Sequence, residues 1–232
     1  MDPRQRLIVA LDVSTAAAAR KIVAAVGDSA YTYKVGMQLY TVEGPSFVRE
    51  LVASGRSVFL DLKYHDIPTT VGAAVREAGQ LGVRMLTVHA SGGGKMLKAA
   101  VEAGQASKPD MLVLAVTVLT SFDDAELGKI GLRGGVLEQV LRLAALALAN
   151  GCKGVVASAL EAGALREEFG HDFTIVTPGV RLPGTGPDDQ ARVVTPAEAI
   201  AAGSSHIVVG RPITGAIDPG AEARAILGQL AV

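Results

Sequence analysis

The chain has 232 residues, 49% of them apolar, a formal net charge of -1 and a pI near 6.4. This charge gives no general attraction to nucleic acid or membranes, so neither is expected as a partner and a small anionic ligand fits better. Cys152 is the only cysteine, which excludes intramolecular disulfides and predicts a cytoplasmic protein. The first apolar run is too short for a signal peptide, and no run of about 18 apolar residues predicts a membrane span.

Short β-branched runs recur along the chain and predict strands. They are Leu7 to Asp12, Tyr31 to Gly36, Ser57 to Leu62, Arg84 to His89, Met111 to Thr117, Gly154 to Ser158, Phe173 to Pro178 and Ser205 to Gly210. The first five begin at 7, 31, 57, 84 and 111, which gives steps of 24, 26, 27 and 27 residues. Such steps hold one strand, one helix and two loops, so the pattern predicts a single-domain (β/α)8 TIM barrel over residues 1–232. A doubly wound open sheet is the alternative, but the glycine-rich loop it usually carries after the first strand is missing.

Helix signals lie between the strands. Ser14 and Thr15 can cap a helix through Val26, and two more helices are predicted where Thr195 precedes Pro196 and Asp218 precedes Pro219. Two longer connections, Ser121 to Gly135 and Arg181 to Gln190, are rich in Gly, Asp or Pro and are predicted active-site loops. The glycine-rich stretch Ser91 to Lys95 is predicted to be a turn and a helix start.

Charged residues stand at the ends of the first three predicted strands, where a barrel of this type places its chemistry. They are Asp12, Lys34, Asp61 and Lys63, with Asp66 three residues further on. Because side chains alternate along a strand, Asp61 and Lys63 share a face and can both point into the barrel. Taken singly, each of these side chains fits a solvated surface charge or half of a salt bridge as well as it fits a catalytic role. Together, alternating Lys and Asp can present an ammonium proton beside fixed negative charge, which suits protonation of a carbanion.

The eleven residues from Asp61 to Val71 read Asp-Leu-Lys-Tyr-His-Asp-Ile-Pro-Thr-Thr-Val. This segment resembles the signature of the orotidine 5'-monophosphate decarboxylases, whose core is Asp-x-Lys-x-x-Asp followed by Ile-Pro and a threonine. The resemblance runs from the first strand to the last. It also covers Leu11-Asp12, Tyr33 to Gly36, Val88 to Ala90, Leu119 to Ser121, Thr177 to Arg181, Asp189-Gln190 and Val208 to Ile213.

The resemblance implies roles for individual residues. Lys63 would donate a proton to C6 of the pyrimidine, Asp61 would lie beside the departing carboxylate, and Lys34 and Asp66 would complete the catalytic network. The implied substrate-binding residues are Asp12, Lys34, Asp61, Ile67, Thr70, Thr120, Pro178, Arg181, Gln190, Gly210 and Arg211. Of these, Arg181, Gly210 and Arg211 would bind the phosphate. The family also implies a homodimer in which Asp66, Ile67 and Thr70 reach into the partner's site.

Gly210 and Arg211 have independent support as a phosphate site, because barrels often bind phosphate after strands seven and eight.

The histidines at 65, 89, 171 and 206 are scattered, so we expect no metal and no cofactor. For His65 and His89, a structural hydrogen-bonding role is expected in preference to general acid catalysis.

Two other functions compete with cofactor-free decarboxylation of orotidine 5'-monophosphate in pyrimidine biosynthesis. One is a Mg²⁺-dependent sugar-phosphate decarboxylase or aldolase of the same suprafamily, but those relatives carry a glutamate where Lys34 stands, and a cation there repels a divalent metal. The other is a non-catalytic barrel that binds nucleotide phosphate. It would need no cluster of Lys and Asp.

Overall fold

The computed structural model describes residues 2–181 and 194–230. These residues form eight parallel strands in chain order, and β8 pairs with β1 to close a barrel. The strands are β1 Leu7–Ala10, β2 Thr32–Gly36, β3 Ser57–Tyr64, β4 Met85–His89, β5 Leu112–Val116, β6 Gly154–Val156, β7 Thr174–Thr177 and β8 His206–Val209. The eight predicted strands and the (β/α)8 barrel are therefore confirmed, and the open doubly wound sheet is excluded.

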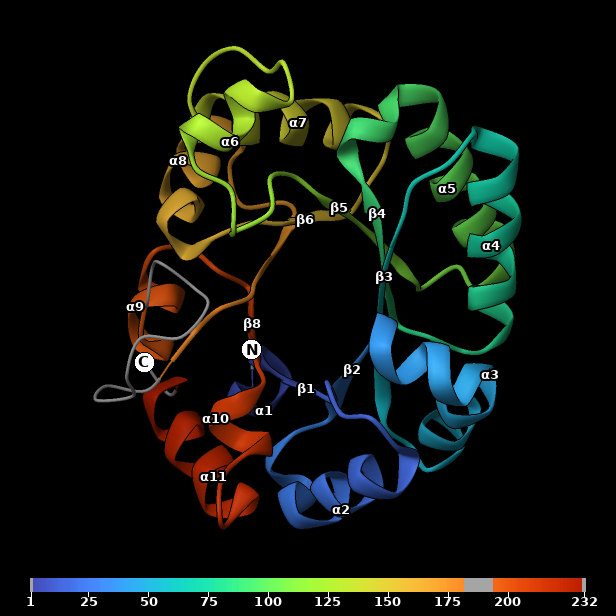
Figure 1. Ribbon diagram of the computed structural model, residues 1–232, viewed down its shortest axis with the longest axis vertical. Helices are drawn as coiled ribbons and strands as arrows, with labels where there is room; N and C mark the ends of the chain where they lie inside the picture. Colours follow the sequence, from blue (N-terminus) through green and yellow to red (C-terminus); the bar gives the residue numbers. More distant parts are fainter. Residues whose placement is uncertain (1, 182–193, 231–232) are drawn as a thin grey trace.

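Helices surround the strands as an outer ring (Figure 1). They are α1 Pro3–Arg6, α2 Ala16–Val26, α3 Met37–Ala53, α4 Pro68–Gln80, α5 Gly93–Ser107, α6 Asp124–Lys129, α7 Val136–Ala149, α8 Ala159–Phe169, α9 Pro196–Ala201, α10 Arg211–Thr214 and α11 Pro219–Leu230. Two 3-10 turns, η1 Gly27–Ser29 and η2 Ala90–Gly92, complete the set. In the described parts of the chain, no helix is both long and apolar enough to cross a membrane.

The predicted helix starts are confirmed by their capping contacts. The Thr15 hydroxyl accepts a hydrogen bond from the amide of Ala18, and Thr195 forms a capping box with Glu198. At the start of α11 the Asp218 carboxylate accepts from the amide of Ala221 at 2.9 Å. Each contact satisfies an amide that has no partner within its own helix.

The long connections differ from simple loops. The stretch from Ser121 to Gly135 contains α6, whose N-cap Asp123 accepts from the amide of Glu126 at 2.8 Å. The stretch from Ser91 to Lys95 is a turn followed by the start of α5, as predicted. Of the loop predicted from Arg181 to Gln190, only Arg181 lies within the described residues.

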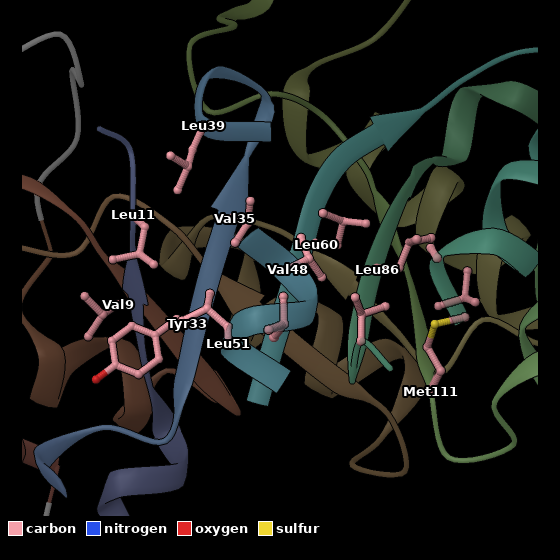
Figure 2. Close-up of a cluster of buried hydrophobic side chains, with 14 of the residues drawn as sticks. Val9, Leu11, Tyr33, Val35, Leu39, Val48, Leu51, Leu60, Leu86 and Met111 are labelled. Atoms are coloured by element: carbon pink, nitrogen blue, oxygen red, sulfur yellow. The ribbon is translucent and has the colours of Figure 1, made fainter. Parts of the chain in front are cut away.

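Alternate residues of each strand face two separate apolar layers, as the strand geometry requires. Seven buried side chains fill the barrel interior: Ile8, Ala10, Phe59, Met85, Leu114, Val176 and Val208. The intervening residues, among them Val9, Leu11, Tyr33, Val35 and Leu60, belong to the layer between strands and helices (Figure 2). Burial on both faces of the sheet explains why the strands of this chain are so rich in apolar residues.

His206 begins β8 and is a buried polar group of the barrel, with 9% of its surface exposed. Its Nδ1 atom has no hydrogen-bond partner among the described residues. Burial, followed by the positive charges of Arg6 and Arg84, lowers the pKa of His206 from its usual 6.5 to about 4. The folded barrel therefore favours the neutral imidazole.

We expect this histidine to limit the stability of the protein in acid. The unfolded chain takes up the proton near pH 6.5 and the folded chain only near pH 4. Stability contributed by His206 is therefore complete above pH 6.5 and is lost as the pH falls to 4, by about 3 kcal/mol in total. Urea unfolding at pH 7 and pH 4.5 should show a smaller pH-dependent loss for His206→Leu than for the wild type. The exposed His171→Leu should retain the wild-type difference, and an unchanged loss in His206→Leu would refute this account.

Candidate active site

Four charged side chains form one chain of contacts at the carboxyl ends of the first three strands. Asp12 follows β1, Lys34 lies on β2, and Asp61 and Lys63 lie on β3. Lys34 Nζ is 2.7 Å from Asp12 Oδ1 and 3.7 Å from Asp61 Oδ2. Lys63 Nζ donates to both oxygens of Asp61 at 2.9 Å. Of the five charged residues predicted to meet at this rim, these four converge, in the order Asp12, Lys34, Asp61 and Lys63.

Burial strengthens these interactions. The side chains of Lys34 and Asp61 are 11% and 13% exposed, whereas that of Lys63 is 25% and that of Asp12 is 54% exposed. Charges at the centre of the array are screened little by water, so their mutual attraction is stronger than in a surface ion pair. The alternation of sign means that each buried charge has an opposite neighbour, which offsets the cost of removing it from water.

The backbone of Lys63 is unusual. Its φ of 52° is the only positive value for a non-glycine residue in the described ranges 2–181 and 194–230. The pairing of β3 with β4 shifts register at this point, since Leu60 pairs with Leu86 and Tyr64 with Val88. Thr87, which lies within this interval on β4, accepts a hydrogen bond from the Lys63 amide and donates one to Asp61 Oδ1, each at 2.9 Å.

Two adjoining cavities meet at the charged array. A polar cavity of about 470 Å³ is lined by Ala10, Asp12, Lys34, Asp61, Pro178, Gly179, Val180, Arg181, Val208, Gly210, Arg211 and Thr214. A smaller cavity of about 160 Å³ is lined mainly by apolar side chains, together with Lys34, Asp61, Lys63 and Thr120. Both cavities share Lys34, Asp61, Pro178 and Val208, so a ligand with an anionic end and a flat apolar end can occupy both.

The predicted site residues divide between these cavities and the surface. Pro178, Arg181, Gly210 and Arg211 line the polar cavity and Thr120 lines the smaller one. Gln190 lies outside the described residues.

Three predicted residues, Asp66, Ile67 and Thr70, are exposed and line neither cavity. Asp66 accepts a hydrogen bond from the amide of Ile67 at 2.6 Å. Within one chain Asp66 therefore lies outside both cavities, and its predicted role in the partner's site stays a prediction.

Gly36 ends β2 beside the array and has a packing role that the sequence alone did not indicate. A Cβ atom at this position would lie 2.9 Å from Asp12 Oδ1 and 3.0 Å from Lys34 Nζ, closer than side chains tolerate. The missing side chain leaves room for the Asp12–Lys34 ion pair. The segment Tyr33 to Gly36 carries the family resemblance, but only the three-dimensional contact explains its glycine.

The histidines and Cys152 do not line the two cavities at the array. The rings of His65 and His89 contact each other with centroids 5.5 Å apart, at an apolar cavity of about 190 Å³. Burial raises the pKa of the Cys152 thiol to about 12, so it stays protonated. Among the described residues, no three His, Cys, Asp or Glu side chains converge closely enough to hold a metal ion.

Comparisons with known proteins agree over almost the whole chain. Residues 5–226 match the family described as orotidine 5'-phosphate decarboxylase / HUMPS. A protein named orotidine 5'-phosphate decarboxylase from Halorhodospira halophila is 54% identical over 226 residues, which cover 97% of this chain and 96% of that protein. One of the same name from Heliobacterium modesticaldum is 49% identical and covers 100% of this chain and 98% of its own length.

Solved structures give the same result. The crystal structure of orotidine 5'-phosphate decarboxylase from Lactobacillus acidophilus is similar to this chain with a TM-score of 0.88 and 40% identity. That similarity covers 98% of this chain and 100% of the Lactobacillus chain. The matches in sequence and in fold lead to one conclusion. The chain belongs to the orotidine 5'-phosphate decarboxylase / HUMPS family.

Proposed function

We propose that this protein decarboxylates orotidine 5'-monophosphate to uridine 5'-monophosphate, a step of pyrimidine biosynthesis, with Lys63 as the proton donor. The observation that carries the proposal is the alternating array Asp12, Lys34, Asp61 and Lys63 at the junction of a polar and an apolar cavity. The names of the close relatives support the same reaction.

The two cavities fit the two ends of the substrate. Arg181, Gly210 and Arg211 line the polar cavity, where guanidinium groups can bind the phosphate oxygens in pairs. The pyrimidine occupies the smaller cavity near Thr120 and Lys63. Asp12 and Lys34 lie between these ends and contact the ribose hydroxyls.

In the chemical step the bond from C6 to the carboxylate breaks and its electron pair stays on C6 as CO₂ leaves. The ammonium of Lys63 stabilises this developing charge and then donates its proton to C6, which leaves a neutral amine to be reprotonated from water. Asp61 orients Lys63 through two contacts of 2.9 Å and disfavours the neighbouring carboxylate of the substrate. Contacts within the array fix its charged groups relative to one another, which lowers the reorganisation needed in the transition state.

The competing functions have less support. A Mg²⁺-dependent enzyme would need acidic ligands where Lys34 contributes an ammonium 2.7 Å from Asp12. A barrel that only binds nucleotide phosphate has no use for the largely buried ion pair of Lys63 and Asp61. We therefore propose a cofactor-free decarboxylase that occupies residues 1–232 as one domain and acts in the cytoplasm, the compartment that the single cysteine favours.

We also propose a homodimer in which Asp66, Ile67 and Thr70 act in the partner's site. Ile67 is 64% exposed, and further apolar side chains, Leu119, Ile130 and Leu132, are exposed around the neighbouring cavity. A second copy covering this surface would bury them and bring Asp66 to the partner's Lys63 without any change in the fold.

The first test of function is the fall in ultraviolet absorbance of orotidine 5'-monophosphate, measured with a chelator present. The wild type should be fully active, and Lys63→Ala should lose kcat by on the order of 1,000-fold or more because it lacks the proton donor. Calorimetric titration should show that Lys63→Ala still binds uridine 5'-monophosphate. Lys98→Ala, which removes an exposed lysine of α5, is the matched control and should behave as the wild type. Near-normal turnover by Lys63→Ala, or wild-type activity that the chelator abolishes, would contradict the proposal.

Gly36→Ala should impair the same reaction while the barrel remains folded. The atoms that crowd the new methyl group are side-chain ends of Asp12 and Lys34, so the ion pair shifts and the backbone does not. We expect kcat/KM to fall on the order of 10- to 100-fold, since displacement by about 1 Å misplaces the substrate. Gly228→Ala on α11, where a Cβ meets nothing within 4 Å, is the control. Equal activity of the two variants would show that the array does not need this space.

The shared site can be tested by mixing inactive variants. Lys63→Ala and Asp66→Ala are unfolded together and refolded, so that random pairing makes about half of the dimers mixed. If Asp66 acts in the partner's site, each mixed dimer has one intact site and activity returns to about a quarter of wild type.

The control for this experiment pairs Lys63→Ala with Asp61→Ala. Both residues belong to the same site, so every site in every dimer carries a lesion and the mixture should stay inactive. Native mass spectrometry verifies that mixed dimers form. Failure of the Asp66 mixture to regain activity, with mixed dimers present, would rule out the shared site.

A further inference from the structure

The pairing between β3 and β4 contains an irregularity at the catalytic centre. Leu60 pairs with Leu86 and Tyr64 pairs with Val88, so three residues of β3 lie opposite the single residue Thr87 of β4. Such a bulge leaves backbone groups without their partners in the ladder. Two of the three residues are Asp61 and Lys63.

One hydroxyl group compensates for this irregularity. Thr87 is fully buried, and its Oγ1 accepts the hydrogen bond of the Lys63 amide at 2.9 Å. The same oxygen donates its own proton to Asp61 Oδ1 at 2.9 Å. A hydroxyl has one proton to donate and lone pairs to accept, so both contacts form at once.

These contacts stabilise two features on which the reaction depends. The first is the backbone conformation of Lys63, whose φ of 52° is unfavourable for a residue with a side chain and needs support from its surroundings. The second is the orientation of the Asp61 carboxylate, both of whose oxygens contact Lys63 Nζ. The amide of Lys63 therefore donates to Thr87 and its ammonium donates to Asp61, and these two neighbours are hydrogen-bonded to each other.

We propose that Thr87 is a positioning residue of the decarboxylase, which holds Lys63 and Asp61 in their reactive arrangement through its hydroxyl group. The inference rests on the proposed function and adds a residue that lines neither substrate cavity. Thr87 acts through its two neighbours, and its hydroxyl does not contact the substrate.

The test compares variants that differ in the hydroxyl. Thr87→Val keeps the shape of the side chain and removes the hydroxyl, whereas Thr87→Ser keeps the hydroxyl. We expect Thr87→Val to lower kcat on the order of 10- to 100-fold with little change in KM. Thr87→Ser should retain most of the wild-type kcat. Thr177→Val is the matched control, because Thr177 is equally buried and its hydroxyl contacts Ser204 at 2.6 Å, away from the array. It should lower stability without lowering kcat.

A double-mutant cycle tests whether Thr87 acts through Asp61. In an Asp61→Asn background, Thr87→Val should cost a smaller factor in kcat than it costs in the wild type, because the orientation it protects is already lost. Multiplicative losses, wild-type kcat in Thr87→Val, or an equal loss in Thr87→Ser would each overturn the proposal.

Folding is measured for each variant by thermal unfolding, and Thr87→Cys serves as a second hydroxyl-free variant close in size to Thr87→Ser. If Thr87→Val and Thr87→Cys both fail to fold while Thr87→Ser folds, the hydroxyl is structural and the positioning role is refuted. Wild-type activity is recorded first in the same assay. Its absence would reject the proposed function, whereas the comparison among Thr87 variants in an active enzyme tests Thr87 alone.

Discussion

The carboxylate of Asp61 is the interaction on which the site depends. It accepts two contacts of 2.9 Å from Lys63 and one from Thr87, and Lys34 lies 3.7 Å away. A carboxylate that is 13% exposed is costly to bury unless cations and hydrogen-bond donors surround it. Each of these neighbours is in turn stabilised by the negative charge. Removing the Asp61 carboxylate therefore affects all of its neighbours, because it takes away the negative charge that Lys63 contacts and the acceptor of the Thr87 hydrogen bond.

The barrel explains why these groups meet. Parallel strands end at the same rim, and alternate side chains point inward, so charges on adjacent strands become neighbours without any long loop. The charged residues come from β1, β2 and β3, while β5, β6 and β8 contribute Val116, Val156 and Val208 to the smaller cavity. The smaller cavity thus has an ionic wall and an apolar wall. A flat ring held against the apolar side faces the ammonium of Lys63.

The sequence predicts the barrel and the charged array because both depend on local spacing. Steps of 24 to 27 residues indicate strand–helix units, and charges at strand ends indicate the rim. The φ of Lys63 and the contacts of Thr87 depend on the register of two strands 24 residues apart, which no local pattern specifies. A threonine within an apolar strand is equally typical of ordinary strand propensity. The resemblance implies that Asp66 acts in the partner's site, and in a single chain Asp66 is exposed.

The two cavities separate binding from chemistry. In the proposed reaction, contacts of Arg181 and Arg211 with a phosphate would stabilise substrate and transition state alike, and they would raise the rate by holding C6 against Lys63. In the proposed reaction the charged array would stabilise the transition state most where charge develops on C6, in the smaller and more apolar cavity. Because Asp61 contacts Lys63, Thr87 and Lys34 within the folded barrel, folding itself orders these groups relative to one another.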